Sequence, residues 1–272
     1  MNNSSNSTPT HSPMGFTLAS SRQKGTSLAS RGGKIRHLLY ILPAGPDWHD
    51  APDHASLLAA LERRGKKADD LAKKPMTLEL PGGCLSSWLR LDATKSVFDW
   101  HSALRQGLKP LLDEHPAEIH IAPMGPDAFR ARVGAAAAYV AWLNGAPLPS
   151  WKSDKAPAAL ARIVLHGVSG LDLKRQQALA EGNTLTRTLT MLPPNMLTPA
   201  TYREHIRALA REASWGIEEF GVKRLKKLKA GAFLAVARGS SHEDAAIVKL
   251  TYRGHGARSR QRPIALVGKG IC

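Results

Sequence analysis

The sequence has few cysteines, few aromatic residues and no long uninterrupted hydrophobic run. Its two cysteines, Cys84 and Cys272, lie far apart, without a CxxC pair or a histidine-rich partner. This scarcity excludes a disulfide framework and a zinc finger, and it favours the reducing cytoplasm. The longest apolar stretch, Val133–Leu143, is too short for a membrane span, which needs about 20 apolar residues. The sequence therefore predicts a cytoplasmic protein with no membrane partner.

Acidic residues are also scarce, because 22 Asp and Glu stand against 38 Lys and Arg, giving a formal net charge of +16. Such a charge is typical of proteins that bind nucleic acid or an anionic surface. The excess is concentrated, since residues 221–272 contain twelve Lys or Arg and only Glu243 and Asp244 as acids. An acidic segment beyond these residues would neutralise it. Nucleic acid is therefore an alternative partner rather than the favoured one.

No acidic residue occurs in positions 1–46, which are rich in Ser, Asn and Thr and carry five Lys or Arg. This composition is similar to that of an organelle transit peptide, but it lacks an amphipathic arginine stripe. It also lacks the continuous apolar core of a secretory signal. We predict that residues 1–34 form a disordered polar lead.

What the sequence does contain is enough apolar material for one large domain or two ordinary ones, with 43% apolar residues in a chain of 272. Strand-like and helix-like segments alternate from residue 35 to residue 169. This alternation predicts an α/β domain of three layers with a mainly parallel sheet. Strands are expected at 35–43, 77–80, 88–91, 117–122 and 161–165, and helices at 52–71, 94–113 and 127–143.

A second region begins with a helix expected at 171–189, which must end before Pro193 and Pro194 because proline cannot continue a helix. Thr198 is a good N-cap and Pro199 suits the first turn, so another helix should begin there. Further strands are expected at 216–220, 232–237, 246–252 and 263–267, with a short basic helix at 222–228. We predict a second α/β domain that is opened but not completed.

Five sequence blocks between residues 178 and 272 occur in the order and spacing of one enzyme family. They are 183–187 with 192–199, 225–236, 239–241, 247–254 and 265–272, the last reading Ala-Leu-Val-Gly-Lys-Gly-Ile-Cys. In this combination the chain resembles the leucyl aminopeptidase, or cytosol aminopeptidase, family of M17-type two-metal metallopeptidases. The last block matches the start of that family's GKGI[TC]FD[ST]GG segment. Two positions depart from the family pattern, with Thr188 in place of Asp and Thr190 in place of Asn.

The resemblance implies a fold and a domain division. Residues 35–169 are expected to form a macro-like N-terminal α/β domain, 170–192 a linker helix, and 193–272 the first part of an aminopeptidase catalytic domain. It also implies an activity, the release of N-terminal amino acids of the leucine type from peptides by a cytoplasmic homohexamer. Two divalent metal ions would serve this reaction, Mn²⁺ or Zn²⁺, with Mg²⁺ as a third candidate.

Lys269 matches the lysine that ligates one of the two metals in the family. An amine must be deprotonated to coordinate a metal, and burial beside two dications would lower its pKa enough for that. The resemblance places the metal-binding carboxylates, the catalytic lysine and a further arginine after the FD[ST]GG segment. We therefore expect a chain that stops within the catalytic domain, holds no catalytic residue, and is inactive as an isolated 272-residue chain.

Other interpretations of these residues remain. Lys269 would be an ordinary solvated lysine in a turn if the five blocks were unrelated, but it does not belong to a phosphate loop, because Pro263 and Gly270 stand where that loop needs Gly and Ser or Thr. The alternative function is a non-catalytic basic α/β protein that binds nucleic acid or a protein partner. Cys84 is interpreted as a small buried residue, the scattered histidines as surface or core residues, and 223–229 as a solvated helix face.

Overall fold

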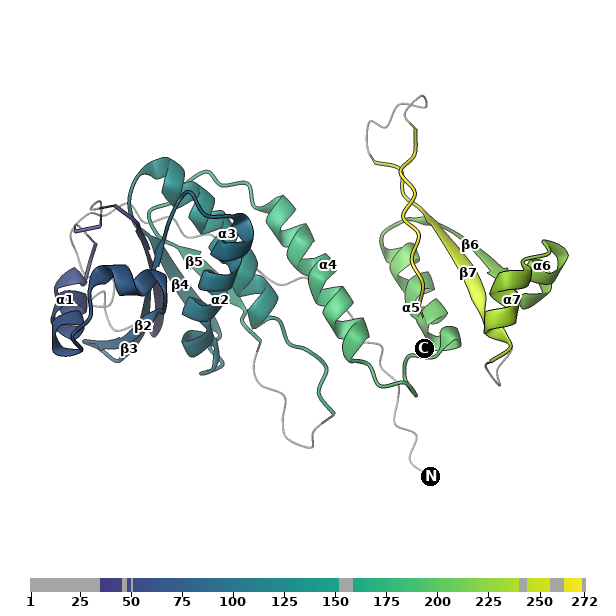
Figure 1. Cartoon of the computed structure of the whole chain (residues 1–272), viewed down its shortest axis with the longest axis horizontal. Helices are drawn as coiled ribbons and strands as arrows, with labels where there is room; N and C mark the ends of the chain where they lie inside the picture. The colour runs from purple at the N-terminus through teal and green to yellow at the C-terminus, as the bar shows by residue number, and fades with distance from the viewer. Residues whose placement is uncertain are drawn as a thin grey trace. The chain divides into compact units, whose positions relative to one another are not determined.

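The computed structural model describes residues 35–45, 48–49, 51–151, 159–239, 244–254 and 262–270. The chain divides into two compact units, Met1–Thr188 and Leu189–Cys272 (Figure 1). The predicted polar lead at 1–34 and Cys272 lie outside the described residues. Within the described residues, no helix is both long and apolar enough to cross a membrane.

The first unit is built on a five-stranded sheet with the strand order β2-β3-β1-β4-β5. The central strand β1 pairs in parallel with β3 and β4, β4 pairs in parallel with β5, and only β2 is antiparallel to its neighbour β3. The strands are β1 (His37–Pro43), β2 (Met76–Leu80), β3 (Cys84–Leu91), β4 (Glu118–Pro123) and β5 (Arg162–Leu165). The predicted mainly parallel sheet is confirmed.

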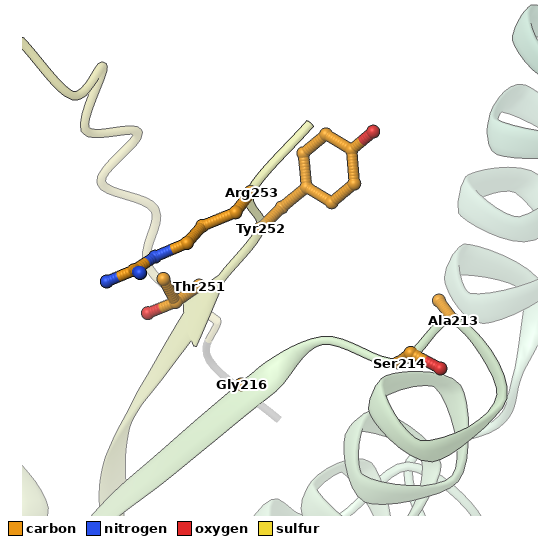
Figure 2. Close-up of a pocket in the computed structure, with 6 residues that line it drawn as sticks. All are labelled: Ala213, Ser214, Gly216, Thr251, Tyr252 and Arg253. Atoms are coloured by element: carbon orange, nitrogen blue, oxygen red, sulfur yellow. The ribbon is translucent and has the colours of Figure 1, made fainter. Parts of the chain in front are cut away.

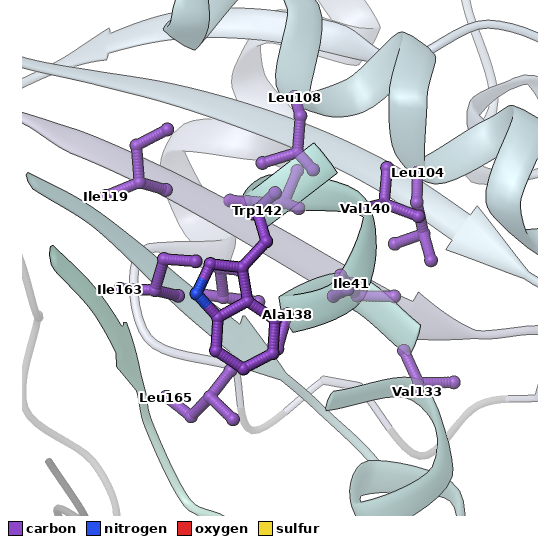
Figure 3. Close-up of a cluster of buried hydrophobic side chains, with 14 of the residues drawn as sticks. Ile41, Leu104, Leu108, Ile119, Val133, Ala138, Val140, Trp142, Ile163 and Leu165 are labelled. Carbon is purple, nitrogen blue, oxygen red and sulfur yellow. The ribbon is translucent and has the colours of Figure 1, made fainter. Parts of the chain in front are cut away.

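Helices cover both faces of this sheet because side chains alternate along β1. Leu38, Tyr40 and Leu42 pack with Leu57 and Leu61 of α1 on one face. The residues between them, among them Ile41, pack on the other face with α2 and α3, where Trp142 fills the centre of the core (Figure 3). The helices are α1 (His54–Arg63), α2 (Val97–Leu112) and α3 (Asp127–Gly145). The expected three-layer architecture is thus confirmed.

One helix expected from the sequence is two elements in the structure. The predicted helix over 52–71 ends with α1 and is followed by a separate 3₁₀-helix, Ala68–Ala72. Gly65 lies between them with a φ of 60°. This left-handed conformation is open to glycine and ends an α-helix.

The fourth helix, α4 (Lys174–Met191), is fastened to α3 by residues of the first sequence block. Asn183 donates a hydrogen bond from Nδ2 to the hydroxyl of Tyr139 at 3.1 Å, and the guanidinium of Arg187 donates to the carbonyl of Leu143. Ala180 and Thr184 are buried. Asn183 and Arg187 lie four residues apart, on the same side of the helix, and therefore hold α4 within the first unit.

Gly145, the last residue of α3, marks a close approach of two segments. A Cβ at this position would lie 2.7 Å from Cβ of Leu160, an atom next to the backbone that cannot rotate away. We expect Gly145→Ala to lower the free energy of unfolding by about 1–3 kcal/mol, measured by urea unfolding. The control is Gly182→Ala on α4, where nothing lies within 4 Å, and where alanine should be neutral or slightly stabilising. A Gly145→Ala protein as stable as the parent would contradict the close approach.

The second unit pairs two antiparallel strands, β6 (Gly216–Gly221) and β7 (Ala246–Thr251). Its helices are α5 (Pro199–Glu212), α6 (Val222–Lys227) and α7 (Gly231–Ala237). As predicted, Thr198 is the N-cap of α5 and its side chain accepts a hydrogen bond from the backbone of Thr201. The capping hydroxyl satisfies an amide that has no partner within the helix.

Two predicted strands of this unit are wrong. The segment expected as a strand at 232–237 is helix α7, because a short apolar run has no period that separates helix from strand, and its alanines favour helix. Residues 263–267 are not assigned to a strand and have no ladder partner within the described residues. Ile264, Leu266 and Val267 are instead 90%, 93% and 97% exposed. A strand needs a hydrogen-bonding neighbour, which the sequence of one segment cannot specify.

Candidate functional site

Lys269 is exposed and lies in the segment 262–270, which is assigned to no helix or strand, so the burial expected for it is absent in this structure. The two glycines beside Lys269 differ in the space around them. Nothing lies within 4 Å of a Cβ built on Gly268, whereas a Cβ on Gly270 would lie 3.4 Å from Cε1 of Tyr202. The segment therefore approaches α5 closely at Gly270 and leaves Lys269 accessible.

The described residues do not fit a two-metal centre on their own. Among them, no group of three or more His, Cys, Asp or Glu side chains could hold a metal ion. A single lysine amine provides one ligand, while divalent metals of this kind take four to six. The role of Lys269 as a metal ligand stays a prediction, and no catalytic step is assigned to these residues.

A pocket of about 410 Å³ lies in the second unit, where α5 ends, β6 begins and β7 ends (Figure 2). Tyr252 belongs to one of the five sequence blocks and is 72% exposed. Its ring and the guanidinium of Arg253 point away from each other (Figure 2). The lining is Ala213, Ser214, Gly216, Thr251, Tyr252 and Arg253. These residues offer hydroxyls and one cation but no carboxylate, imidazole or thiol, so the side chains that most often act as a general base do not line this pocket.

Helix α5 is held to β6 by a cluster of opposite charges. Glu219 accepts hydrogen bonds from Nε of Arg203 at 2.8 Å and from Nε of Arg207 at 2.5 Å. The hydrogen bond from Arg207 is the main cause that lowers the pKa of Glu219 to about 2. At the start of α5, the carboxylate of Asp244 accepts a hydrogen bond from the backbone amide of Ala200 at 3.1 Å. These contacts position the helix against which Gly270 lies.

The Glu219 cluster predicts how the second unit responds to acid. Because the folded pKa is lower than the ordinary value of 4.5, the stabilisation is complete above about pH 4.5 and is lost as the pH falls towards 2. We expect Glu219→Gln to increase hydrogen exchange of residues 199–221 at pH 7. After correction for intrinsic rates, the opening equilibrium of these residues should also rise less in the variant than in the parent as the pH falls from 5 to 2. The control is Glu212→Gln, at the exposed end of α5, which should leave both unchanged. Equal behaviour of the two variants would contradict the role of Glu219.

The basic run 223–229 is a solvated helix face, as interpreted from the sequence. Leu225 is the buried residue of α6. The guanidinium of Arg224 lies 4.0 Å from the ring centroid of Phe220 and donates to Glu218 at 2.7 Å. At least this cation is therefore neutralised within the protein.

Cys84 is fully buried, which confirms its interpretation as a small core residue. Burial raises the pKa of its thiol to about 11, with a further contribution from Asp53. A thiol with this pKa is almost entirely protonated at neutral pH. It is therefore a poor nucleophile.

The structure brings together two histidines that the sequence analysis treated as scattered. His120 on β4 and His166 just after β5 are 46 residues apart, yet their ring nitrogens lie 2.8 Å from each other. A signal existed, since His120 lies in one strand and His166 directly follows the next strand of an alternating α/β pattern. The register between the strands could not be predicted from that pattern.

Comparison with known proteins shows a similarity to one family over part of this chain. Residues 184–272 match the model of the cytosol aminopeptidase family, catalytic domain. A probable cytosol aminopeptidase from Ralstonia pickettii (strain 12J) is 39% identical over 127 residues, covering 44% of this chain and 24% of the relative. A second, from Pseudomonas aeruginosa (strain UCBPP-PA14), is 44% identical over 99 residues, covering 36% of this chain and 19% of the relative.

A solved structure shares the fold over a longer stretch. A mutant of tomato leucine aminopeptidase superimposes with a TM-score of 0.66 at 18% identity, covering 89% of this chain and 52% of that chain. At such identity the likeness shows the fold alone. The chain spans about half the length of this structure, and its match to the Ralstonia relative spans about a quarter of that relative.

Proposed function

We propose that this chain, whose residues 184–272 match the model of the catalytic domain of the cytosol aminopeptidase family, contributes to a metal-dependent aminopeptidase. Such an enzyme would release N-terminal amino acids, leucine among them, from peptides. The family match, which includes Lys269 between two glycines, is the observation that carries the proposal.

The proposal divides the chain into three parts of such an enzyme. Residues 35–169 form the N-terminal α/β domain, 170–192 the linker helix, and 193–272 the first part of the catalytic domain. Asn183 and Arg187, which hold α4 to α3, would then connect the linker helix to the N-terminal domain. The Glu219 cluster would hold α5 in place beside the segment that carries Lys269.

Lys269 is the one metal ligand assigned to this chain. Its amine would bind one of two divalent ions, Mn²⁺, Zn²⁺ or Mg²⁺, and must be neutral to do so. Because the described residues do not complete a metal site, the other ligands must come from residues outside them. Peptides with a free N-terminus as substrates, a homohexamer and a cytoplasmic location are parts of the same proposal.

A comparison of two proteins tests the proposal. One is the 272-residue chain, and the other is the same chain continued after Cys272 by the remaining catalytic segment of the Ralstonia pickettii relative. Release of leucine from leucyl amide is measured with added Mn²⁺ or Zn²⁺ and again after chelation. We expect no release by the first protein and metal-dependent release by the second. A folded second protein that binds metal and hydrolyses nothing would refute the proposal.

The alternative function is a non-catalytic basic protein that binds nucleic acid or a protein partner. The observation in its favour is the net charge of +16 together with the exposed basic face of α6. Salt-sensitive binding of DNA by the 272-residue chain, with no hydrolysis by the extended protein, would support it.

A further inference from the structure

Two buried histidines meet in the first unit at neighbouring parallel strands. His120 and His166 are 9% and 8% exposed. Nδ1 of His120 lies 2.8 Å from Nε2 of His166, with an angle of 21° between the rings and 5.1 Å between their centroids. The rings therefore meet edge to edge in nearly one plane, which is the geometry of a direct N–H···N hydrogen bond.

The charged groups beside His120 determine where the protons of the pair lie. Nε2 of His120 lies 2.7 Å from Oε1 of Glu118 on the same strand. The other carboxylate oxygen lies 3.0 Å from Nε of Arg162, at the start of β5. On β1, the residue paired with His120 is the uncharged Leu38. A carboxylate only accepts, so His120 donates from Nε2 and accepts at Nδ1, which makes Nε2 of His166 the donor.

This hydrogen bond can accommodate only a limited number of protons. If His166 gains a proton at Nδ1, the bond survives, because Nε2 of His166 still donates and Nδ1 of His120 still accepts. If His120 gains the proton at Nδ1, the bond survives only when the proton of His166 moves from Nε2 to Nδ1, so that Nε2 becomes the acceptor. If both rings are protonated, two N–H groups and two positive charges face each other at 2.8 Å. Arg162 adds a further positive charge nearby. The closed arrangement therefore excludes the doubly protonated state.

We propose that His120 and His166 form an acid-opened latch that holds β5 and the following segment, residues 166–173, against β4. The backbone amide of His166 also donates to the carbonyl of Ile121 on β4 at 2.8 Å, so the latch lies where the chain leaves the sheet. From there the segment runs directly into α4. At neutral pH the latch is closed, and on acidification it opens with uptake of up to two protons.

The direction of the pH effect follows from burial. Burial is the main cause that lowers the pKa of His120 below 6.5, and Glu118 opposes it. A histidine whose pKa is lower in the closed state stabilises that state above its ordinary pKa. This stabilisation is lost as the pH falls below about 6.5.

Hydrogen exchange of the 272-residue protein tests the latch. After correction for intrinsic rates, exchange at residues 162–173 reports the opening equilibrium. Uptake of more than one proton should raise it by more than about tenfold, and at most about a hundredfold, per pH unit below pH 6.5. Residues 37–43 of β1, measured in the same sample, should stay protected, which separates latch opening from unfolding of the unit.

Glutamine variants separate proton uptake from simple loss of a contact. In His166→Gln, the side-chain amide can still donate to Nδ1 of His120, but it cannot gain a proton. We expect exchange in this variant to rise by no more than about tenfold per pH unit. His120→Gln, whose side-chain amide can both accept and donate, should behave in the same way. In the double variant, the corrected exchange of residues 162–173 should no longer depend on pH. His49→Gln, at an exposed histidine of the same unit, should match the parent.

Nitrogen-15 NMR of the histidine rings provides an independent measurement that does not depend on the variants folding. At pH 8, His120 should carry its proton on Nε2 and His166 should donate from Nε2. A proton on Nδ1 of His120 at pH 8 would refute the latch. The latch would also be refuted if the opening equilibrium of the parent depended on pH no more steeply than that of His166→Gln.

Discussion

Replacing Lys269 by alanine is expected to lower leucine release by the extended protein by about a hundredfold or more. The change removes the one metal ligand assigned to this chain, and one ion of the pair would be lost or misplaced. Activity would be measured as kcat/KM at saturating Mn²⁺, together with the number of ions bound by calorimetry. Lys269→Ala should bind fewer ions than the parent.

A second substitution at the same position separates coordination from charge. Lys269→Arg keeps a positive charge, but a guanidinium cannot lose its proton to become a ligand, so this variant should be as inactive as Lys269→Ala. The control is Lys249→Ala on β7, an exposed lysine paired with Glu218 at 3.6 Å, which should leave activity unchanged. Full activity of Lys269→Arg would show that the position needs only a solvated cation.

Replacing Arg90 by alanine is expected to lower the free energy of unfolding of the first unit by about 2–4 kcal/mol. Arg90 lies on β3 with its side chain 11% exposed. Its guanidinium donates to the carbonyls of Pro43, at 2.9 Å, and Gly45, at 3.1 Å, and also contacts Ala44 and Asp69. Without it, carbonyls at the end of the central strand lose their partners. Unfolding in urea measures the loss.

Two further variants show whether the loss comes from this set of contacts. Arg90→Lys keeps the charge but lacks the planar fork of donors, so it should recover only part of the stability. Arg105→Ala, at an exposed arginine on α2, should change stability by less than about 0.5 kcal/mol. A loss below about 1 kcal/mol in Arg90→Ala would mean that water satisfies the freed carbonyls.

The first unit could be predicted in detail because its signals are local and agree with one another. The apolar run of β1 and the spaced apolar residues of α2 and α3 are each readable from a few residues. The second unit was predicted less well, because two of its apolar runs, at 231–237 and 263–267, contain no period that separates helix from strand. Their conformation depends on neighbours that are distant in the sequence.

The sequence by itself determined the α/β class, the order of strands and helices in the first unit, the cap of α5 and the family resemblance that singles out Lys269. These depend on residue type and spacing along the chain. Only the tertiary structure decided that His120 meets His166, that Arg90 binds the end of β1, and that Lys269 is exposed in the described arrangement. Such contacts follow from strand register and from packing between distant segments, and neither is encoded in the spacing of one segment.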